Sequence, residues 1–117
     1  MSGHRLTDYI EHICQAATDA CHYVEGMDKG DFLADKRTQQ ATIMNLIIVG
    51  EAATKIMDRF PEFVELHPEI LWHGMRGMRN RIAHGYFDIN LDIVWETIQT
   101  ALPDLLKQLS SLPAEDG

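Results

Sequence analysis

The chain contains 117 residues, of which 45% are hydrophobic and 24% charged, and its formal net charge at pH 7 is −8. That length and apolar content suit one domain, spanning 1–117, with a single hydrophobic core. The acidic balance excludes a protein that simply coats nucleic acid, because non-specific phosphate binding needs an excess of Lys and Arg. The N-terminus shows no signal-peptide pattern, and the longest apolar run, Leu46–Val49, is far short of the ~20 residues that span a bilayer. We therefore expect a cytoplasmic protein with no membrane partner.

An amphipathic helix is predicted from about Leu6 to Met27. Its apolar side chains recur at spacings of three and four residues, and charged side chains occupy the opposite face. Cys14 and Cys21 both fall on this helix, roughly 10 Å apart along its axis, which is too far for a disulfide. We interpret both as buried thiols.

The sequence Asp-Lys-Gly-Asp at 28–31 predicts a turn, and Phe32–Ala34 predicts a short apolar plug. A second long helix is predicted from Lys36 to Arg59. Its middle, Ala41–Ala53, is apolar almost all round, which indicates a helix surrounded by other helices.

Two polar residues, Asn45 and Glu51, interrupt this apolar stretch. A buried carboxylate needs a hydrogen-bonding or charged partner. One interpretation of Glu51 is a structural hydrogen bond or ion pair. The other is that Glu51 contacts Arg79 and orients it, without touching the substrate itself.

Two prolines, Pro61 and Pro68, bracket a short helix at Glu62–His67 that reverses the chain. A further helix is predicted over Leu71–His84, with Trp72 near its start. Its inward stripe is interpreted as core and consists of Met75, Met78 and Ile82.

The sequence Asp-Ile-Asn at 88–90 predicts a turn and an N-cap. The apolar spacing after it predicts a last amphipathic helix from Leu91 to Leu109, which Pro103 should kink or restart. A frayed tail is expected at 110–117. Together these elements predict an all-α fold, an up-and-down bundle of four to five helices.

Phosphate-handling groups gather in one segment, Arg79-Asn80-Arg81-Ile82-Ala83-His84-Gly85-Tyr86. Arg is a permanent planar cation with several donors for phosphate oxygens, and His gives or takes a proton near neutral pH. From His67 to Tyr86 there are three Arg and one acid, a net charge of +2, so the rest of the chain carries −10. A basic site on an acidic body fits a phosphate-containing target, or a groove completed by a second copy.

Helical spacing places these groups on different sides of the motif helix. Asn80 and His84 lie about 40° apart on one face, whereas Arg79 lies about 140° from His84 and must reach round with its long side chain. Gly85 is a suitable residue for the end of the helix, so His84 would lie in the last turn. Unsatisfied carbonyls there favour a positive charge, and hence an imidazolium that acts as a general acid.

The order Arg79-Asn80, then His84, then Tyr86 resembles the signature of HepT-type toxins of the HEPN superfamily. The flanks are similar too: Ile70-Leu71-Trp72 precedes a Gly-Met-Arg-Asn run, and Asn45–Ala53 is similar to the family's second-helix segment. One departure is Leu71, where relatives often have Pro before the Trp. This departure bears on the helix start rather than on the chemistry.

The resemblance implies a small all-helical ribonuclease toxin that acts on RNA as a homodimer. It also implies a partner, a minimal nucleotidyltransferase antitoxin that adenylylates the motif tyrosine, Tyr86 here. Arg79 and His84 are then the catalytic candidates, with Asn80 and Glu51 in supporting roles.

The chemistry expected from the residues needs no metal and no cofactor. The sequence has no glycine-rich phosphate loop, no Cys/His zinc spacing and no acidic cluster for a two-metal mechanism. Attack by the 2′-OH of RNA remains, and it needs a base, an acid and cations on the phosphorane. Because one chain offers one well-placed His, a two-fold dimer that unites both copies of Arg79 and His84 would supply the set.

Two other interpretations stay open at this point. In one, the bundle has no nuclease activity and presents Arg79, His84 and Tyr86 to a nucleotidyltransferase partner as a binding subunit. In the other, the motif is structural, with Arg79 paired to Glu51 and His84 capping its helix.

Overall fold

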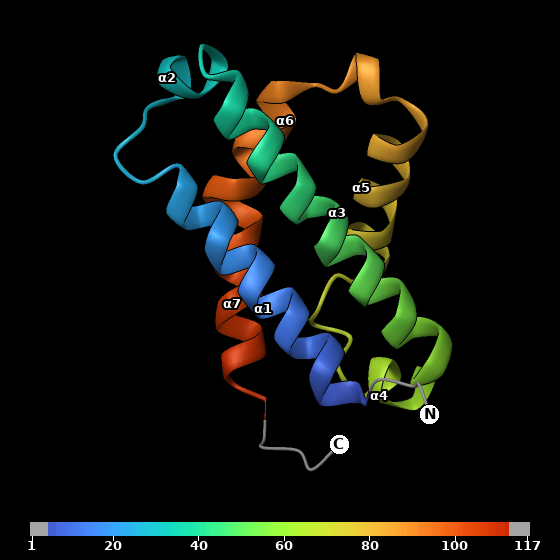
Figure 1. The fold of residues 1–117 in the computed structure, drawn as a ribbon. Coiled ribbons are helices and arrows are strands. Elements are labelled where there is room, and N and C mark those ends of the chain that lie inside the picture. The colour runs from blue at the N-terminus through green and yellow to red at the C-terminus, as the bar shows by residue number, and fades with distance from the viewer. Residues whose placement is uncertain (1–4, 113–117) are drawn as a thin grey trace.

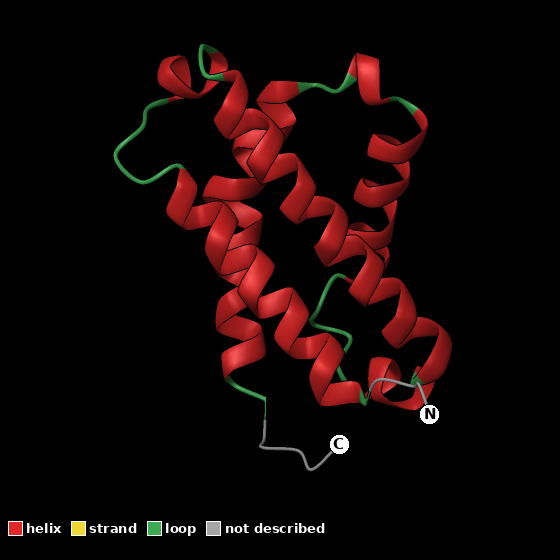
Figure 2. Cartoon of the chain, in the orientation of Figure 1, coloured by secondary structure: helices red, strands yellow, loops and turns green. Residues whose placement is uncertain are grey.

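The computed structural model describes residues 5–112. Long helical segments run up and down along the molecule in chain order, joined by short connections (Figure 1). The segments are α1 (Leu6–Tyr23), α3 (Lys36–Arg59), α5 (Trp72–His84) and a last stretch made of α6 (Leu91–Glu96), η2 (Thr97–Ala101) and α7 (Leu102–Ser110). Within the described residues every regular element is helical (Figure 2). The prediction of an all-α helical bundle is confirmed.

The first helix is shorter than predicted, since α1 ends at Tyr23 and not at Met27. Gly26 follows with φ 79°, a left-handed conformation that side chains disfavour and glycine adopts freely. The N–H of Met27 donates to the carbonyl of Val24 at 3.0 Å, which closes the turn. A glycine in this conformation ends the helix before the apolar pattern does.

The turn predicted at 28–31 is wrong, because this segment begins a short helix, α2 (Lys29–Leu33). The N–H of Asp31 donates to Asp28 Oδ1 at 2.8 Å, and the N–H of Asp28 donates to Asp31 Oδ2 at 3.2 Å. Each carboxylate thus satisfies a main-chain donor that a helix start leaves unpaired. The predicted apolar plug is confirmed at Phe32, which is fully buried with its ring 5.4 Å from that of Trp95.

Helix α3 has the predicted bounds and begins at an Asp35 cap, whose Oδ1 accepts from the N–H of Thr38 at 3.2 Å. The expectation that other helices surround its middle is wrong. Met44 is 56% exposed, and Ile48, one turn later, is also exposed. One apolar strip of α3 therefore faces outward in the single chain.

A short helix, α4 (Pro61–Leu66), reverses the chain before α5, close to the position predicted. Leu71 occupies the N-cap position of α5 without a capping side chain. The indole Nε1 of Trp72, which is buried, donates to the carbonyl of His67 at 3.1 Å and secures the start of the helix.

The predicted kink near Pro103 takes the form of a π turn, η2, within the last stretch. The N–H of Leu102 donates to the carbonyl of Thr97, five residues back, and Pro103 has no N–H to donate. The carbonyl of Ile98 is thereby left without a donor from the next turn, and Cys21 Sγ lies 3.8 Å from it as a thiol donor. Helix α7 ends at Ser110, and the part of the expected tail at 113–117 lies outside the described residues.

Both cysteines are free, as expected from their spacing. They are only partly buried rather than fully so. Burial raises the pKa of the Cys14 and Cys21 thiols, and the charge of Glu11 adds to the effect on Cys14.

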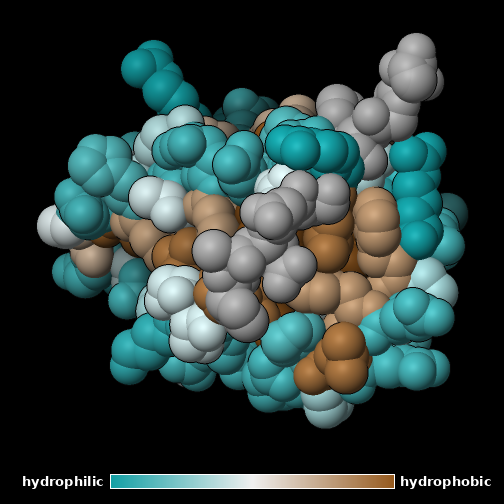
Figure 3. Space-filling model, turned by 90° about the horizontal axis from the view of Figure 1, so that it is seen from below, coloured by the Kyte–Doolittle hydropathy of each residue, from teal (hydrophilic) through white to brown (hydrophobic). Residues whose placement is uncertain are grey.

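The core is built where α1 packs against α3 and α7, and where α3 packs against α5. At the end of the bundle where α1 begins and α7 ends, apolar surface shows between polar side chains (Figure 3). A small cavity of about 170 Å³ lies there, lined in part by Leu6, Ile10, Phe63 and Leu109. The motif helix, α5, lies on the other flank of α3.

Candidate functional site

The motif helix is set on α3 by a close approach at Gly50. A Cβ built at Gly50 would lie 2.7 Å from the carbonyl oxygen of Met75 and would overlap the Cβ of Arg79. Only a residue without a side chain fits between the two helices. Arg79 therefore leaves α5 directly against the surface of α3.

Arg79 is held by two polar residues of α3. Its Nη1 donates to Glu51 Oε2 at 2.9 Å, and its Nη2 lies 3.5 Å from Thr54 Oγ1. The Arg79 Nε is buried and has no hydrogen-bond partner among residues 5–112. Arg79 can therefore meet another molecule through its Nη atoms alone.

The partner predicted for Glu51 is thus Arg79, but the expectation of a buried carboxylate is wrong. The Glu51 side chain is 52% exposed, because it stands on the outward strip of α3. Both interpretations of Glu51 converge on this one contact, which is an ion pair and also fixes the guanidinium of Arg79.

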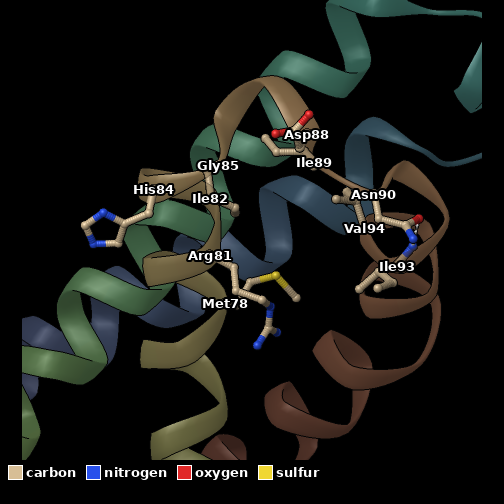
Figure 4. Close-up of a pocket in the computed structure, with 10 residues that line it drawn as sticks. All are labelled: Met78, Arg81, Ile82, His84, Gly85, Asp88, Ile89, Asn90, Ile93 and Val94. Atoms are coloured by element: carbon tan, nitrogen blue, oxygen red, sulfur yellow. Dashed lines mark hydrogen bonds between the residues drawn. The ribbon is translucent and has the colours of Figure 1, made fainter.

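The other two arginines of α5 differ from each other. Arg76 Nη2 donates to Asp58 Oδ1 at 3.3 Å, so it too is tied to α3. Arg81 is exposed and forms no ion pair within residues 5–112; its Nη1 folds back along α5 toward Gly77. Arg81 is thus a cation without a charged partner in the described chain, and the sequence interpretation gave it no role beyond its charge. Its side chain and that of His84 lie on different sides of the helix (Figure 4).

The predicted acid–base residue, His84, is exposed in the last turn of α5. The helix ends as expected at Gly85, whose N–H donates to the carbonyl of Arg81 at 3.0 Å. In Figure 4 the imidazole points away from the bundle. It forms no hydrogen bond with any described residue, so the interpretation of His84 as a helix cap has no support in these contacts.

Asn80 and Tyr86 lie near His84, on the helix and just beyond it. Asn80 is half-buried one turn before His84. Tyr86 begins a 3-10 turn, η1 (Tyr86–Asp88), and is 47% exposed, with its ring edge-on to that of Phe87 at 5.9 Å. Phe87 itself is 97% exposed.

Arg79 and His84 do not converge within one chain. Arg79 points onto α3 through its ion pair, whereas His84 points outward from the helix end (Figure 4). The divergence follows from the spacing of five residues, which separates the two side chains by about 140° around the helix.

A cavity of about 360 Å³ lies beside the end of α5, between α5 and α6 (Figure 4). Met78 and Ile82 form its wall on α5, and Ile93 and Val94 form its wall on α6. A second cavity of about 430 Å³ continues along the same flank of α5, past Met78 and toward α7.

Among residues 5–112 no group of three or more His, Cys, Asp or Glu side chains could hold a metal ion. Over the same range, no helix has the length and apolarity that a membrane span requires.

The fold and the site together define an all-α bundle in which one basic helix carries an Arg, an Asn and a His, with a Tyr just beyond its end. The family model described as ribonuclease HepT-like matches residues 9–112. The chain therefore belongs to the HepT-like ribonuclease family, and the family resemblance seen in the motif is confirmed.

Individual relatives agree with the family assignment. The chain is 36% identical to a protein described as probable ribonuclease HepT from Thermococcus cleftensis, over 90% of this chain and 93% of that protein. It is also 36% identical to a candidate RNase from Caldanaerobacter subterraneus, over 89% and 90% of the two chains. A candidate RNase from Methanocaldococcus jannaschii is 29% identical over 89% of this chain and 84% of its own length. No solved structure matches the chain. The prediction of an RNA-cleaving enzyme is thus confirmed at the level of the family.

Proposed function

We propose that this chain is a metal-independent endoribonuclease and the toxin of a toxin–antitoxin pair in the cytoplasm. A ribose 2′-OH attacks the adjacent phosphorus, the bond to the 5′-oxygen breaks, and the products carry a 2′,3′-cyclic phosphate and a 5′-hydroxyl. A base must take the 2′-OH proton and an acid must protonate the leaving oxygen, each contributing about 10²–10⁴-fold. The observation that carries the proposal is the exposed His84 ring, without a hydrogen-bond partner in the described chain, at the end of a basic helix.

A second copy of the chain completes the proposed site. The reaction needs an acid and a base, and each chain supplies one motif histidine. Because Arg79 and His84 diverge within one chain, groups from two chains facing each other across a two-fold axis would surround one phosphate. Exposed apolar side chains at Met44 and Phe87 would also gain from burial against a partner.

Arg79 stabilises the charge that develops on the phosphorane, and Glu51 has a positioning role. Glu51 accepts from Nη1 and so fixes the plane of the guanidinium. Among residues 5–112, Nη2 makes only the long contact to Thr54, which leaves an N–H donor for a phosphate oxygen. Asn80, one turn before His84, supports the same face as a neutral donor.

Tyr86 is the proposed control point. Its half-exposed position beyond Gly85 leaves the hydroxyl within reach of a partner enzyme. In the modification, the phenolic oxygen attacks the α-phosphorus of ATP, the bond to pyrophosphate breaks, and the phenolic proton is lost to a base. A minimal nucleotidyltransferase antitoxin would supply the ATP site and Mg²⁺. The resulting phosphodiester carries a negative charge, which would compete with RNA for Arg79.

The activity is tested with single-stranded RNA in excess EDTA. We expect wild-type protein to release fragments with terminal 2′,3′-cyclic phosphate, and Arg79→Ala and His84→Ala to lose cleavage. His84→Ala should change the free energy of unfolding by less than about 0.5 kcal/mol, because the side chain is exposed. Intact RNA together with tight binding of a nucleotidyltransferase would instead identify a non-catalytic binding subunit.

The shared site is tested with mixed dimers. Wild-type and His84→Ala chains, carrying different tags, are refolded together and the hybrid is purified. A hybrid with one shared site lacks either its acid or its base, so we expect its activity to fall about a hundredfold. A hybrid that retains half of the wild-type activity would show that each chain carries an independent site.

The control point is tested by co-expression with a nucleotidyltransferase encoded beside the chain's gene. We expect a mass increase of one or more AMP units on Tyr86, with loss of nuclease activity. If Tyr86→Phe is inhibited as strongly as wild type and without a mass change, the partner acts by binding alone.

A further inference from the structure

The cavity between α5 and α6 has no part in the proposed cleavage step. It occupies about 360 Å³, which lies within the range of small-ligand sites. The buried side chains of Ile82 and Val94 form its floor. Its walls belong to two different helices, with Met78 on α5 and Ile93 on α6 (Figure 4).

Polar groups line the edge of this cavity, and some of them keep donors or acceptors that no described residue uses. Asn90 Oδ1 accepts from the N–H groups of Asp92 and Ile93 at 2.9 and 3.2 Å, so it caps α6. The NH₂ of the same amide makes no hydrogen bond within residues 5–112 and remains a donor. The Asp88 carboxylate, also at the edge, is exposed and forms no ion pair in the described chain.

Arg81 and His84 both lie at the edge of the cavity, with their side chains on different sides of α5 (Figure 4). Met78, Arg81 and His84 follow one another at spacings of three residues on α5, so neighbouring side chains have Cβ atoms about 5–6 Å apart. Met78 contributes an apolar wall, Arg81 a cation that forms no ion pair among residues 5–112, and His84 a proton donor or acceptor. The cavity and its edge therefore offer an apolar wall suited to a base and a cation suited to its phosphate, with the acid–base residue one helical turn beyond Arg81.

We propose that the cavity holds an unstacked nucleobase of single-stranded RNA beside the cleaved bond, while Arg81 binds the adjoining phosphate. This inference rests on the proposed ribonuclease function and names how its substrate is recognised. Two apolar walls with polar groups at the edge suit a flat heterocycle, which has apolar faces and hydrogen-bonding edges. Arg81 is suited to this contact because it lines the cavity and forms no ion pair among residues 5–112, whereas Arg76 and Arg79 lie on the α3 side of α5.

The cavity is tested by binding, separately from cleavage. The probes are fluorescent single-stranded RNAs with 2′-fluoro groups, which cannot undergo 2′-OH attack, in a set that differs by one base at a time. We expect wild-type protein to prefer one base at one position. Ile93→Phe, which fills the cavity from its exposed rim, should weaken binding of the preferred RNA about tenfold and remove the preference.

Leu66→Phe is the matched control, because Leu66 is an exposed apolar residue on α4. It should bind every probe like wild type. Equal base preference in Ile93→Phe and Leu66→Phe, with both folded by circular dichroism, would overturn the base site.

The phosphate contact is tested with Arg81→Gln. The control variant is Lys107→Gln, which removes an exposed charge from α7. Removing a phosphate contact should weaken binding of all probes alike and lower the salt dependence by about one counterion. Loss of base preference in Arg81→Gln, or an equal effect of Lys107→Gln, would contradict this assignment.

The two proposals can fail separately. If base-selective binding depends on Ile93 but unmodified RNA stays intact, the nuclease proposal fails and the base site stands. If RNA is cleaved and Ile93→Phe changes neither binding nor the sequence of the cut sites, the base site fails and the nuclease stands.

Discussion

The two flanks of α5 are packed in opposite ways. On the α3 flank, the helices approach so closely that Gly50 has no room for a side chain, and ion pairs from Arg76 and Arg79 cross the contact. On the α6–α7 flank, cavities of about 360 and 430 Å³ separate the helices. A motif helix built this way keeps its orientation through one contact and leaves its other side accessible to a ligand.

The contact at Gly50 should give the largest effect on stability. We expect Gly50→Ala to lower the free energy of unfolding by about 3 kcal/mol, because the new methyl group overlaps main-chain and side-chain atoms of α5. Urea denaturation measures the change. Gly74→Ala is the control in the same helix region, since its Cβ would meet only Leu71 Cβ at 3.5 Å. That variant should be stabilised by up to about 1 kcal/mol, and equal losses in the two variants would show that the α3 contact is not special.

The ion pair on the same flank should matter for rate more than for stability. We expect Glu51→Gln to reduce kcat about tenfold, because the guanidinium of Arg79 is less well oriented. The loss of stability should stay below about 1 kcal/mol, since the Glu51 side chain is half exposed. Asp58→Asn removes the neighbouring pair with Arg76 and should leave kcat unchanged. If both variants lose activity equally, the whole α3–α5 contact acts as one unit and Glu51 has no separate role.

The open flank should tolerate added volume. Ala101 lines the larger cavity, so we expect Ala101→Leu to raise the free energy of unfolding by about 0.5 kcal/mol. Ala101→Ser keeps the size of the side chain and serves as the control in the same urea titration. A loss of more than about 1 kcal/mol in Ala101→Leu would mean that this flank is already filled.

The smallest effect is expected from the cap of α3, far from both flanks of the motif. Hydrogen bonds from the main-chain N–H and the hydroxyl of Thr38 hold the pKa of Asp35 below its usual range. A lowered pKa in the folded state means that the cap contributes stability above the ordinary Asp pKa of about 3.9 and loses it as pH falls through the lowered value. Titrating the stability of wild type and Asp35→Asn from neutral pH downward should show the two curves converging below about pH 4. Parallel curves would remove Asp35 from the acid response.

The sequence was sufficient to place α3 by its long apolar stretch and to end α5 at Gly85, and the structure adds the Asp35 cap at the start of α3. It failed at α2, where residues typical of a turn instead form a reciprocal cap between Asp28 and Asp31. Composition alone does not distinguish these two uses of the same carboxylates.

The exposed strip of α3 could not have been predicted from its own residues. An apolar helix predicts burial on all sides, yet Met44 and Glu51 face outward because no described helix covers that side. The sequence could not show either that Arg76 and Arg79 pair with acids of α3 while Arg81 has no ion pair among residues 5–112. Partners of charged residues across a helix contact are properties of the fold, whereas the divergence of Arg79 from His84 follows from helical spacing alone.

The π turn in the last helical stretch marks a position where the chain could lose one residue without disturbing the helices on either side. A main-chain bond from Leu102 to Thr97 encloses one residue more than an α-helical bond would. A one-residue deletion within Thr97–Ala101 would therefore return the turn to α-helical form and leave α6 and α7 in their present places. A deletion at Pro103 or Asp104 of α7 would instead rotate the following residues by about 100° and turn Leu105 and Leu109 out of the core. Natural length differences among relatives should accordingly concentrate at this turn.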